Sequence, residues 1–322
     1  MRAVVCRELG PVEHLRVEGV PELLPRPGSV RVRVEAAGAS YVDALQVAGK
    51  YQFAMQPPYT PGGEAAGVID AVGEGVNVFA VGDRVLASTG HGAWAEAVLA
   101  KPHQLYRIPD SLDSLRAATF LQVYGTAWFA LTRRTHVNAG DVVLVTGAGG
   151  GVGLAAIDVA RSLGARVIAV ASSEEKRALA LQAGAEAAVA TDDDVKTRAR
   201  ELTDGKGIDV VYDVTGGDVS EQALRALRFD GRFVVIGFTA GISRVPLNLV
   251  LLNNRTVVGV EWGGWVQRNA EANRSLIDEV ITAIGDGRLR PVAPFVRPLV
   301  DTAAVCNALL TRQAVGKIAL VP

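Results

Sequence analysis

The first third of the chain shows short alternations of apolar and polar residues, separated by glycine and proline. In "SVRVRVEAAG", Val30, Val32 and Val34 alternate with charged residues. A period of two is typical of a strand with one buried face, as in antiparallel sheets. Similar runs follow at "AAGVIDAVGEG", "GDRVLAS" and "WAEAVLA". Several short strands at this spacing predict a small barrel or sandwich over residues 1–121.

From residue 122 the pattern changes to buried apolar runs that alternate with amphipathic segments. The runs "DVVLVTG" and "ARVIAVAS" predict strands, and "VGLAAIDVARSLG" between them predicts a helix with Val152, Ala156, Val159 and Leu163 on one stripe. Two further strand runs follow, "GIDVVYDVTGG" and "GRFVVIGF". Strands that alternate with helices predict an α/β fold, with a doubly wound parallel sheet over 122–261.

The last sixty residues return to a mixed pattern. The segment "NRSLIDEVITAIGDGRL" predicts a helix, and "PFVRPL" and "GKIALV" predict strands. We therefore expect the barrel-like domain to be split, with residues 262–322 returning to it.

Composition excludes several classes of protein. The chain has 322 residues, 49% of them hydrophobic and 21% charged, with a net charge of −1. It is long enough for full cores, and it has no basic run to bind nucleic acid or a membrane surface. The start lacks the apolar region of a signal peptide, and no apolar stretch reaches the length of a membrane span. With two cysteines, Cys6 and Cys306, we expect a cytoplasmic protein without a disulfide framework.

The segment "TGAGGGVGLAA" (146–156) places a glycine-rich turn between the first predicted strand and helix of the parallel sheet. Such a turn holds the pyrophosphate of a dinucleotide against a helix N-terminus, where glycine permits a tight turn and close backbone approach. The spacing is G-x-x-G-x-x-G through Gly147, Gly150 and Gly153, because Ala148 stands where a strict G-x-G-x-x-G needs glycine.

The end of the second strand indicates which dinucleotide binds. A site for NAD places Asp or Glu there, on the ribose 2′-hydroxyl. Here the strand ends at Ala171, and Ser172, Ser173 and Lys176 follow. Hydroxyls and a cation favour the 2′-phosphate of NADPH. Either serine could also cap the next helix, and the neighbouring pair Glu174–Glu175 argues for NADH.

Long segments resemble the medium-chain dehydrogenase/reductase superfamily, and most closely its zinc-free quinone oxidoreductase branch, which includes zeta-crystallin. They include "EAAGASYVDALQVAGKY", "TPGGEAAGVIDAVGEGVNVFAVGDRV" and "GDVVLVTGAGGGVGLAAIDVARSLGARVIAVASSEEK". The resemblance implies a split GroES-like β-barrel catalytic domain (1–121 and 262–322). It also implies a Rossmann NADPH-binding domain (122–261) and a homodimer joined through Rossmann edge strands.

The resemblance also bears on metal binding. Zinc alcohol dehydrogenases of this superfamily hold catalytic zinc with Cys and His at positions that are Ser40 and Gly63 here, and the third ligand falls near Leu121–Gln122. Zinc needs three or four nitrogen or sulfur ligands. We therefore expect no metal.

The activity that the resemblance implies is metal-independent hydride transfer from NADPH to a quinone or another α,β-unsaturated carbonyl. Such acceptors are already activated, so a general acid, typically worth ~10²–10⁴-fold, is useful rather than indispensable. Two alternatives stay open, an NADPH-dependent enoyl or alkenal double-bond reductase and a non-catalytic, crystallin-like NADPH-binding protein.

The candidate site residues follow from the turn and from the resemblance. Asp43 and Glu64 are expected to be structural carboxylates, and Tyr124 is as consistent with cofactor contact as with packing. The catalytic candidates are Ser40, Tyr41 and Tyr51. The cofactor-binding candidates are Thr126, Gly147, Gly150, Gly151, Val152, Gly153, Ser172, Lys176, Phe238 and Trp262.

Overall fold

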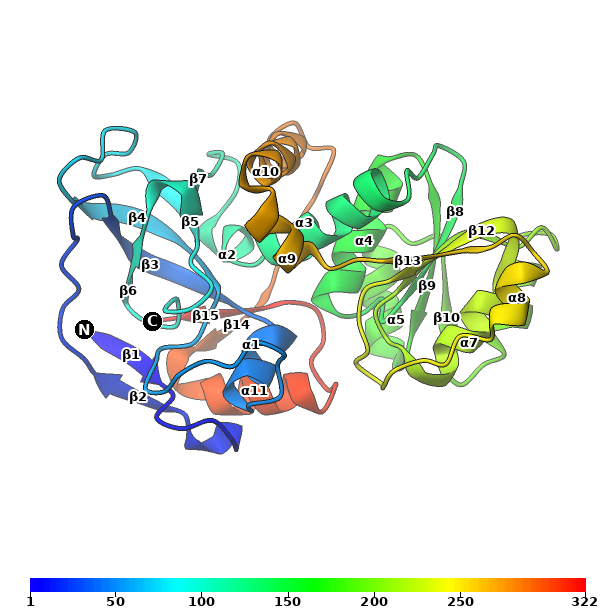
Figure 1. Ribbon diagram of the computed structural model, residues 1–322, viewed down its shortest axis with the longest axis horizontal. Helices are drawn as coiled ribbons and strands as arrows, with labels where there is room; N and C mark the ends of the chain where they lie inside the picture. Colours follow the sequence, from blue (N-terminus) through cyan, green and yellow to red (C-terminus); the bar gives the residue numbers. More distant parts are fainter. The chain divides into compact units, whose positions relative to one another are not determined.

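The computed structural model describes all 322 residues and divides into two compact units. Unit 1 comprises Met1–Gln122 and Ala293–Pro322, and unit 2 comprises Val123–Val292. Both ends of the chain lie in unit 1 (Figure 1). None of the helices combines the length and the apolarity that crossing a bilayer requires.

Unit 1 is built around a seven-stranded sheet in the order β14-β15-β3-β4-β5-β7, with β6 also paired to β3. A separate two-stranded sheet pairs β1 with β2. The strands are β1 (Arg2–Val5), β2 (Arg16–Gly19), β3 (Val30–Ala39), β4 (Glu64–Val72), β5 (Arg84–Ser88), β6 (Ala97–Ala100), β7 (Leu105–Arg107), β14 (Phe295–Pro298) and β15 (Ile318–Val321).

The alternation expected in β3 is confirmed, since Val30, Val32 and Val34 are buried and Arg33 is exposed. Trp94 fills the centre of this core and donates its indole N–H to the carbonyl of Gly38 at 2.9 Å. The helices of unit 1 are α1 (Tyr41–Val47), α2 (Ser114–Ala117) and α11 (Thr302–Leu310).

Unit 2 holds a parallel six-stranded sheet in the order β10-β9-β8-β11-β12-β13. Numbered along the chain, this order is 3-2-1-4-5-6, the doubly wound arrangement that the sequence predicts. The strand order reverses between β8 and β11, which makes their carboxyl ends the expected ligand crevice. The strands are β8 (Val142–Thr146), β9 (Arg166–Ala171), β10 (Ala187–Ala190), β11 (Ile208–Asp213), β12 (Leu227–Val235) and β13 (Thr256–Gly259).

Helices α4, α5, α6 and α7 connect the first strands of this sheet. Helix α4 is buried at every residue from Gly153 to Ala160, so the single apolar stripe expected from the sequence was too narrow. The remaining helices are α3 (Leu121–Trp128), α4 (Gly151–Ser162), α5 (Glu174–Gln182), α6 (Val195–Glu201), α7 (Gly217–Ala226), α8 (Leu247–Leu251), α9 (Trp262–Arg268) and α10 (Ala270–Gly285).

The second boundary between the units differs from the sequence expectation. Unit 1 resumes at Ala293 rather than at residue 262, because α9 and α10 pack on the segment around α3. The rings of Phe129 and Trp265 lie 4.6 Å apart, and the indole N–H of Trp128 donates to Glu279 at 2.8 Å. These contacts keep both helices in unit 2.

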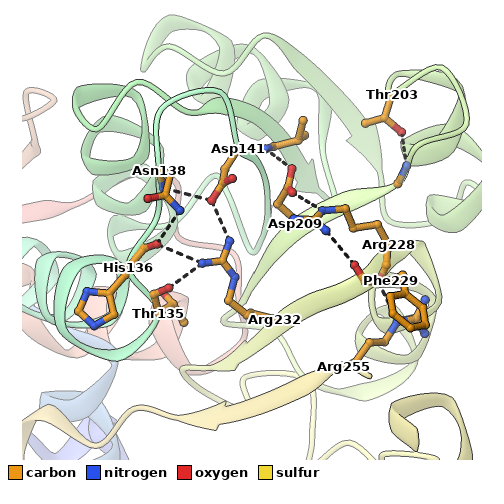
Figure 2. A network of polar contacts seen from close by, with 12 residues as sticks. Thr135, His136, Asn138, Asp141, Thr203, Asp209, Arg228, Phe229, Arg232 and Arg255 are labelled. Carbon is orange, nitrogen blue, oxygen red and sulfur yellow. Dashed lines mark hydrogen bonds and ion pairs between the residues drawn. The ribbon is translucent and has the colours of Figure 1, made fainter. Parts of the chain in front are cut away.

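A polar network ties together the amino ends of β8, β11 and β12 (Figure 2). Arg232 donates to Asp141 at 2.8 Å and to the carbonyl of Thr135 at 2.7 Å. Asp209 accepts from the backbone N–H of Val142 at 2.8 Å and from the Arg228 guanidinium. This end of the sheet is therefore closed by ion pairs, and the opposite end carries the glycine turn.

Candidate functional site: a glycine turn in unit 2 and a buried charge cluster in unit 1

The glycine turn joins β8 to α4. Gly147 has a φ of +63°, in the left-handed region that favours glycine. Gly150 is the N-cap residue of α4, and no side chain caps the helix. The first backbone N–H groups of α4, from Gly151, Val152 and Gly153, therefore lack an intrahelical partner and are positioned to bind an anion.

The glycines of the turn serve different purposes. A Cβ on Gly153 would lie 2.4 Å from the carbonyl oxygen of Gly147 and 2.6 Å from Cα of Ala148, so the helix can pack on the turn only with glycine there. A Cβ on Gly150 would meet nothing nearer than the Gly147 oxygen at 3.6 Å. Gly150 thus faces open space in which a phosphate can approach the backbone.

Lys176 lies beside this turn. A Cβ on Gly149 would be 2.4 Å from Cβ of Lys176, so the lysine stem runs directly over the glycine backbone. Ser173 caps α5 by accepting the N–H of Lys176 at 3.3 Å, which resolves the two capping alternatives in favour of Ser173. Arg177 donates to the carbonyl of Ala171 at 3.3 Å. Lys176 is therefore the basic residue whose stem packs on the glycine turn.

The side chain of Tyr124 is hydrogen-bonded within unit 2. Its hydroxyl donates to the buried carboxylate of Asp158 at 2.9 Å, and Asp158 also accepts from Arg161 at 2.7 Å and from the Arg290 N–H at 2.6 Å. Burial, and then the neighbouring Asp158 charge, raises the pKa of Tyr124 well above its usual value. The hydroxyl of Tyr124 thus ties α3 to α4.

The other cofactor candidates lie on α3, on α9 and beyond β12. The Trp262 ring covers Gly125, where a Cβ would lie 2.6 Å from Cη2, and its N–H donates to Asn273 at 3.2 Å. One face of the Trp262 ring is therefore covered by packing against Gly125. Phe238 is half exposed in the turn after β12, and Thr126 is partly buried on α3. Their contacts with a cofactor stay predictions.

In unit 1, Ser40 and Asp43 form a capping box at the start of α1. The Ser40 hydroxyl lies 2.6 Å from Oδ2 of Asp43, the Ser40 N–H donates to the same oxygen at 2.9 Å, and the Gly63 N–H donates to Oδ1 at 3.1 Å. Burial raises the pKa of Asp43 to about 6, although the Ser40 hydrogen bonds and the Lys317 charge act against the rise. The expectation of a structural carboxylate is confirmed for Asp43 by these contacts.

Glu64 completes a buried cluster of three ionisable groups. Its Oε2 accepts the N–H of Gln122 at 3.1 Å, and its Oε1 forms an ion pair with Nζ of Lys317 at 3.1 Å, at angles outside those of a hydrogen bond. Glu64 and Lys317 are both buried, and Asp43 senses the charges of both. One ion pair, between Glu64 and Lys317, thus lies in the interior of unit 1, near enough to Asp43 for both charges to act on its carboxyl group.

The two tyrosines expected near the acceptor lie on and after α1. Tyr41 is the first residue of α1, and the ring of Tyr51 meets that of Phe53 edge-on at 5.9 Å. Both are partly exposed. Proton donation by either residue stays a prediction.

Comparison with known proteins agrees with this arrangement. Residues 26–110 match the alcohol dehydrogenase GroES-like domain, and residues 151–280 match the zinc-binding dehydrogenase model. Quinone oxidoreductase-like protein 2 of Bos taurus is 38% identical over 322 residues, covering 99% of this chain and 92% of that protein. The chain belongs to the quinone oxidoreductase-like branch of the medium-chain dehydrogenases/reductases.

Solved structures of the family superpose over the whole chain. Mycobacterial Rv1454c, complexed with NADPH, gives a TM-score of 0.90 at 30% identity, with 100% of both chains covered. The Escherichia coli quinone oxidoreductase, also complexed with NADPH, gives 0.88 at 26% identity, again over 100% of both chains. The two-domain fold expected from the sequence, a GroES-like domain and a Rossmann domain, is confirmed.

The residues present do not fit the zinc that one family model carries in its description. Gly63 has no side chain, and the Ser40 hydroxyl is held by Asp43. The backbone of Gln122 is held by Glu64, whose other oxygen pairs with Lys317. No group of three or more His, Cys, Asp or Glu side chains in the structure could hold a metal ion. Metal independence of the reaction stays a prediction.

Two buried charged residues, Lys317 beside Glu64 and Asp158 beside Tyr124, were not identified from the sequence. Lys317 lies in "GKIALV", a segment that indicates a strand and gives no sign of a buried ammonium. Asp158 sits within an apolar helix, where a lone carboxylate is a signal of a specific partner, because burial without one is costly.

The pKa of Asp43 predicts a pH-dependent contribution to stability. The folded protein holds this proton up to pH about 6, whereas an unfolded aspartate loses it near 3.8. The contribution is therefore fully present below pH 4 and is lost as the pH rises through about 6, by about 3 kcal/mol. We expect the unfolding free energy of the protein relative to Asp43→Asn to fall by this amount between pH 4 and pH 7, measured by denaturant titration. A difference that does not change with pH would contradict the raised pKa.

Proposed function

We propose that the protein is an NADPH-dependent, metal-independent oxidoreductase that reduces a quinone or another α,β-unsaturated carbonyl. The observation that carries the proposal is the glycine turn with the Lys176 stem laid over Gly149, beside a strand end that has no carboxylate. Family members solved with NADPH support the same cofactor.

In this proposal the residues of unit 2 hold NADPH. The N–H groups of Gly151, Val152 and Gly153 would hold the pyrophosphate at the start of α4. Ser172 and Lys176 would hold the 2′-phosphate, through a hydroxyl and a charge-assisted hydrogen bond. When bound, NADPH supplies a hydride. Thr126, Phe238 and Trp262 are the candidates for contact with its nicotinamide half.

The acceptor needs little further activation. A quinone or enone takes the hydride at carbon because the resulting negative charge is delocalised onto oxygen, and one proton completes the reduction. Positioning of the acceptor supplies much of the rate enhancement in such reactions. Ser40, Tyr41 and Tyr51 are the proposed proton donors or positioning groups, and water is the other source.

The test is a two-by-two assay that follows loss of absorbance by the reduced nicotinamide ring. NADPH and NADH are each offered with a benzoquinone and with a simple enone. Rapid loss with NADPH and the quinone is the expected result. Loss with the enone alone would assign the protein to the double-bond reductases, and binding of NADPH without loss would support a non-catalytic role.

Lys176→Met tests the phosphate site. The methionine keeps the apolar stem over Gly149 and removes the ammonium, so NADPH affinity should fall by ~1.5–3 kcal/mol, about 10–150-fold, with NADH affinity unchanged. Calorimetric titration with both cofactors measures the difference. An equal loss for NADH and NADPH would reject Lys176 as the group that binds the 2′-phosphate.

We also propose that the protein is a homodimer joined through β13, one of the two edge strands of the unit 2 sheet. An edge strand offers unpaired backbone groups. Val257 on this strand is 39% exposed, and the preceding helix α8 presents Leu247 and Leu251 at 74% and 76% exposure. Exposed apolar residues of this kind are typical of a covered interface.

Val257→Glu is expected to shift the sedimentation coefficient from that of a dimer to that of a monomer, because it places a carboxylate on each side of the paired edge. The control is Leu24→Glu, a leucine of unit 1 that is 74% exposed. A dimer that survives Val257→Glu would exclude β13 as the contact.

A further inference from the structure

Asp213 is a buried carboxylate at the carboxyl end of β11 that the proposed chemistry does not use. Its Oδ1 accepts from the Thr146 hydroxyl at 2.5 Å and from the Gly216 N–H at 3.4 Å. Its Oδ2 accepts from the Ser220 hydroxyl at 2.5 Å. A carboxylate this deeply buried is costly unless its oxygens are hydrogen-bonded, so these donors are needed to keep it there.

Thr146 connects this carboxylate to the backbone of the turn after β11. Its hydroxyl donates to Asp213 and accepts from the N–H groups of Val214 at 3.0 Å and Thr215 at 3.2 Å. Thr146 is the last residue of β8 and directly precedes Gly147. One hydroxyl therefore links the glycine turn to the neighbouring turn 214–216.

Residues 213–215 form backbone hydrogen bonds with the segment that carries Phe238. The Asp213 carbonyl accepts from the N–H groups of Ile236 at 2.9 Å and Gly237 at 3.2 Å, and the Thr215 carbonyl accepts from Ala240 at 2.7 Å. Backbone hydrogen bonds therefore fix the segment 236–240 to residues 213–215.

The order of strands assigns these turns to different halves of a dinucleotide. The glycine turn follows β8, and Lys176 lies beyond β9, on the side where the adenosine ribose binds. The turns after β11 and β12 lie across the reversal of strand order, on the side that remains for the nicotinamide half.

We propose that Thr146, through Asp213 and the turn 214–216, is a positioning residue for the nicotinamide half of the cofactor. It sets the position of the Phe238 segment relative to the glycine turn and touches no reacting atom. The proposal rests on the proposed NADPH function. It predicts that loss of the bridging hydroxyl weakens binding of the whole dinucleotide and leaves its adenosine half unaffected.

Two variants separate this role from a general effect on folding. Thr146→Val removes the bridging hydroxyl at nearly constant volume. Ser220→Ala removes the other hydroxyl on the same carboxylate without touching the 214–216 backbone. Thr146→Ser keeps the hydroxyl and is the rescue variant. If Thr146→Val does not fold, Thr146→Ala removes the same hydroxyl with a smaller side chain.

The measurement is calorimetric binding of NADPH and of adenosine 2′,5′-bisphosphate to each variant, with Tm recorded alongside. Thr146→Val should bind NADPH about tenfold more weakly and the bisphosphate with unchanged affinity, while Ser220→Ala and Thr146→Ser bind both normally. Unchanged NADPH binding by Thr146→Val, or an equal loss for both ligands, would overturn the proposal. A wild-type protein that binds neither ligand would overturn the proposed function, and this inference with it.

Discussion

Replacing Gly150 with valine is expected to abolish dinucleotide binding in a chain that still folds. The φ of Gly150 is −98°, which valine adopts readily, and its Cβ would have no neighbour nearer than the Gly147 oxygen at 3.6 Å. The isopropyl group would instead fill the space through which, in the proposed function, the pyrophosphate approaches the N–H groups of α4. Because that approach carries several charge-assisted hydrogen bonds, we expect NADPH affinity to fall more than about 100-fold, measured by calorimetry.

The matched control is Gly153→Ala, in the same turn. Its Cβ would collide with backbone atoms at 2.4 and 2.6 Å, so the helix and the turn must separate. We expect a loss of about 3 kcal/mol in the free energy of unfolding, at the upper end for an overpacked core. Normal NADPH binding by Gly150→Val would mean that the pyrophosphate does not approach this glycine.

Lys317→Met is expected to destabilise unit 1 by about 3–5 kcal/mol, which is the usual cost of leaving a buried charge without its partner. Glu64 would keep the N–H of Gln122 and lose the ammonium at 3.1 Å, and the carboxyl of Asp43 lies close enough to sense that loss. Denaturant unfolding at neutral pH measures the change.

The double variant Glu64→Gln/Lys317→Met serves as the control, because it removes both charges and leaves the amide oxygen to accept from Gln122. We expect it to recover most of the stability, as buried ion pairs replaced by neutral groups often do. A single variant that costs less than about 1 kcal/mol would show that the ion pair between Glu64 and Lys317 does not stabilise unit 1.

The strands and helices were predictable where each segment shows one strong period. Val30, Val32 and Val34 place one face of β3 in the core, and the run before Gly147 places β8 in the centre of a sheet. The return of the chain to unit 1 was not predictable, because α9 and α10 are held in unit 2 by aromatic side chains from distant segments.

In the candidate site, too, features set by neighbouring residues were predictable, and features set by contacts between distant segments were not. The glycine turn, the absent carboxylate after Ala171 and the position of Lys176 can be read along the chain, because strand, turn and helix follow one another. The roles of Lys317 and Thr146 depend on partners 253 and 67 residues away, at Glu64 and Asp213. No local pattern reports such a pairing.

The pairing of β15 with β3 has a consequence for how the protein is made. Strand β15 (Ile318–Val321) lies between β14 and β3, and β3 is synthesised almost three hundred residues earlier. During synthesis, all of Val123–Val292 therefore emerges from the ribosome before β15 is available to pair with the edge of β3. Since domains generally fold as they emerge, the dinucleotide-binding unit can form on the ribosome before the barrel closes. Until Ile318–Val321 leave the tunnel, the nascent sheet of unit 1 carries an open edge at β3 that is prone to aggregation.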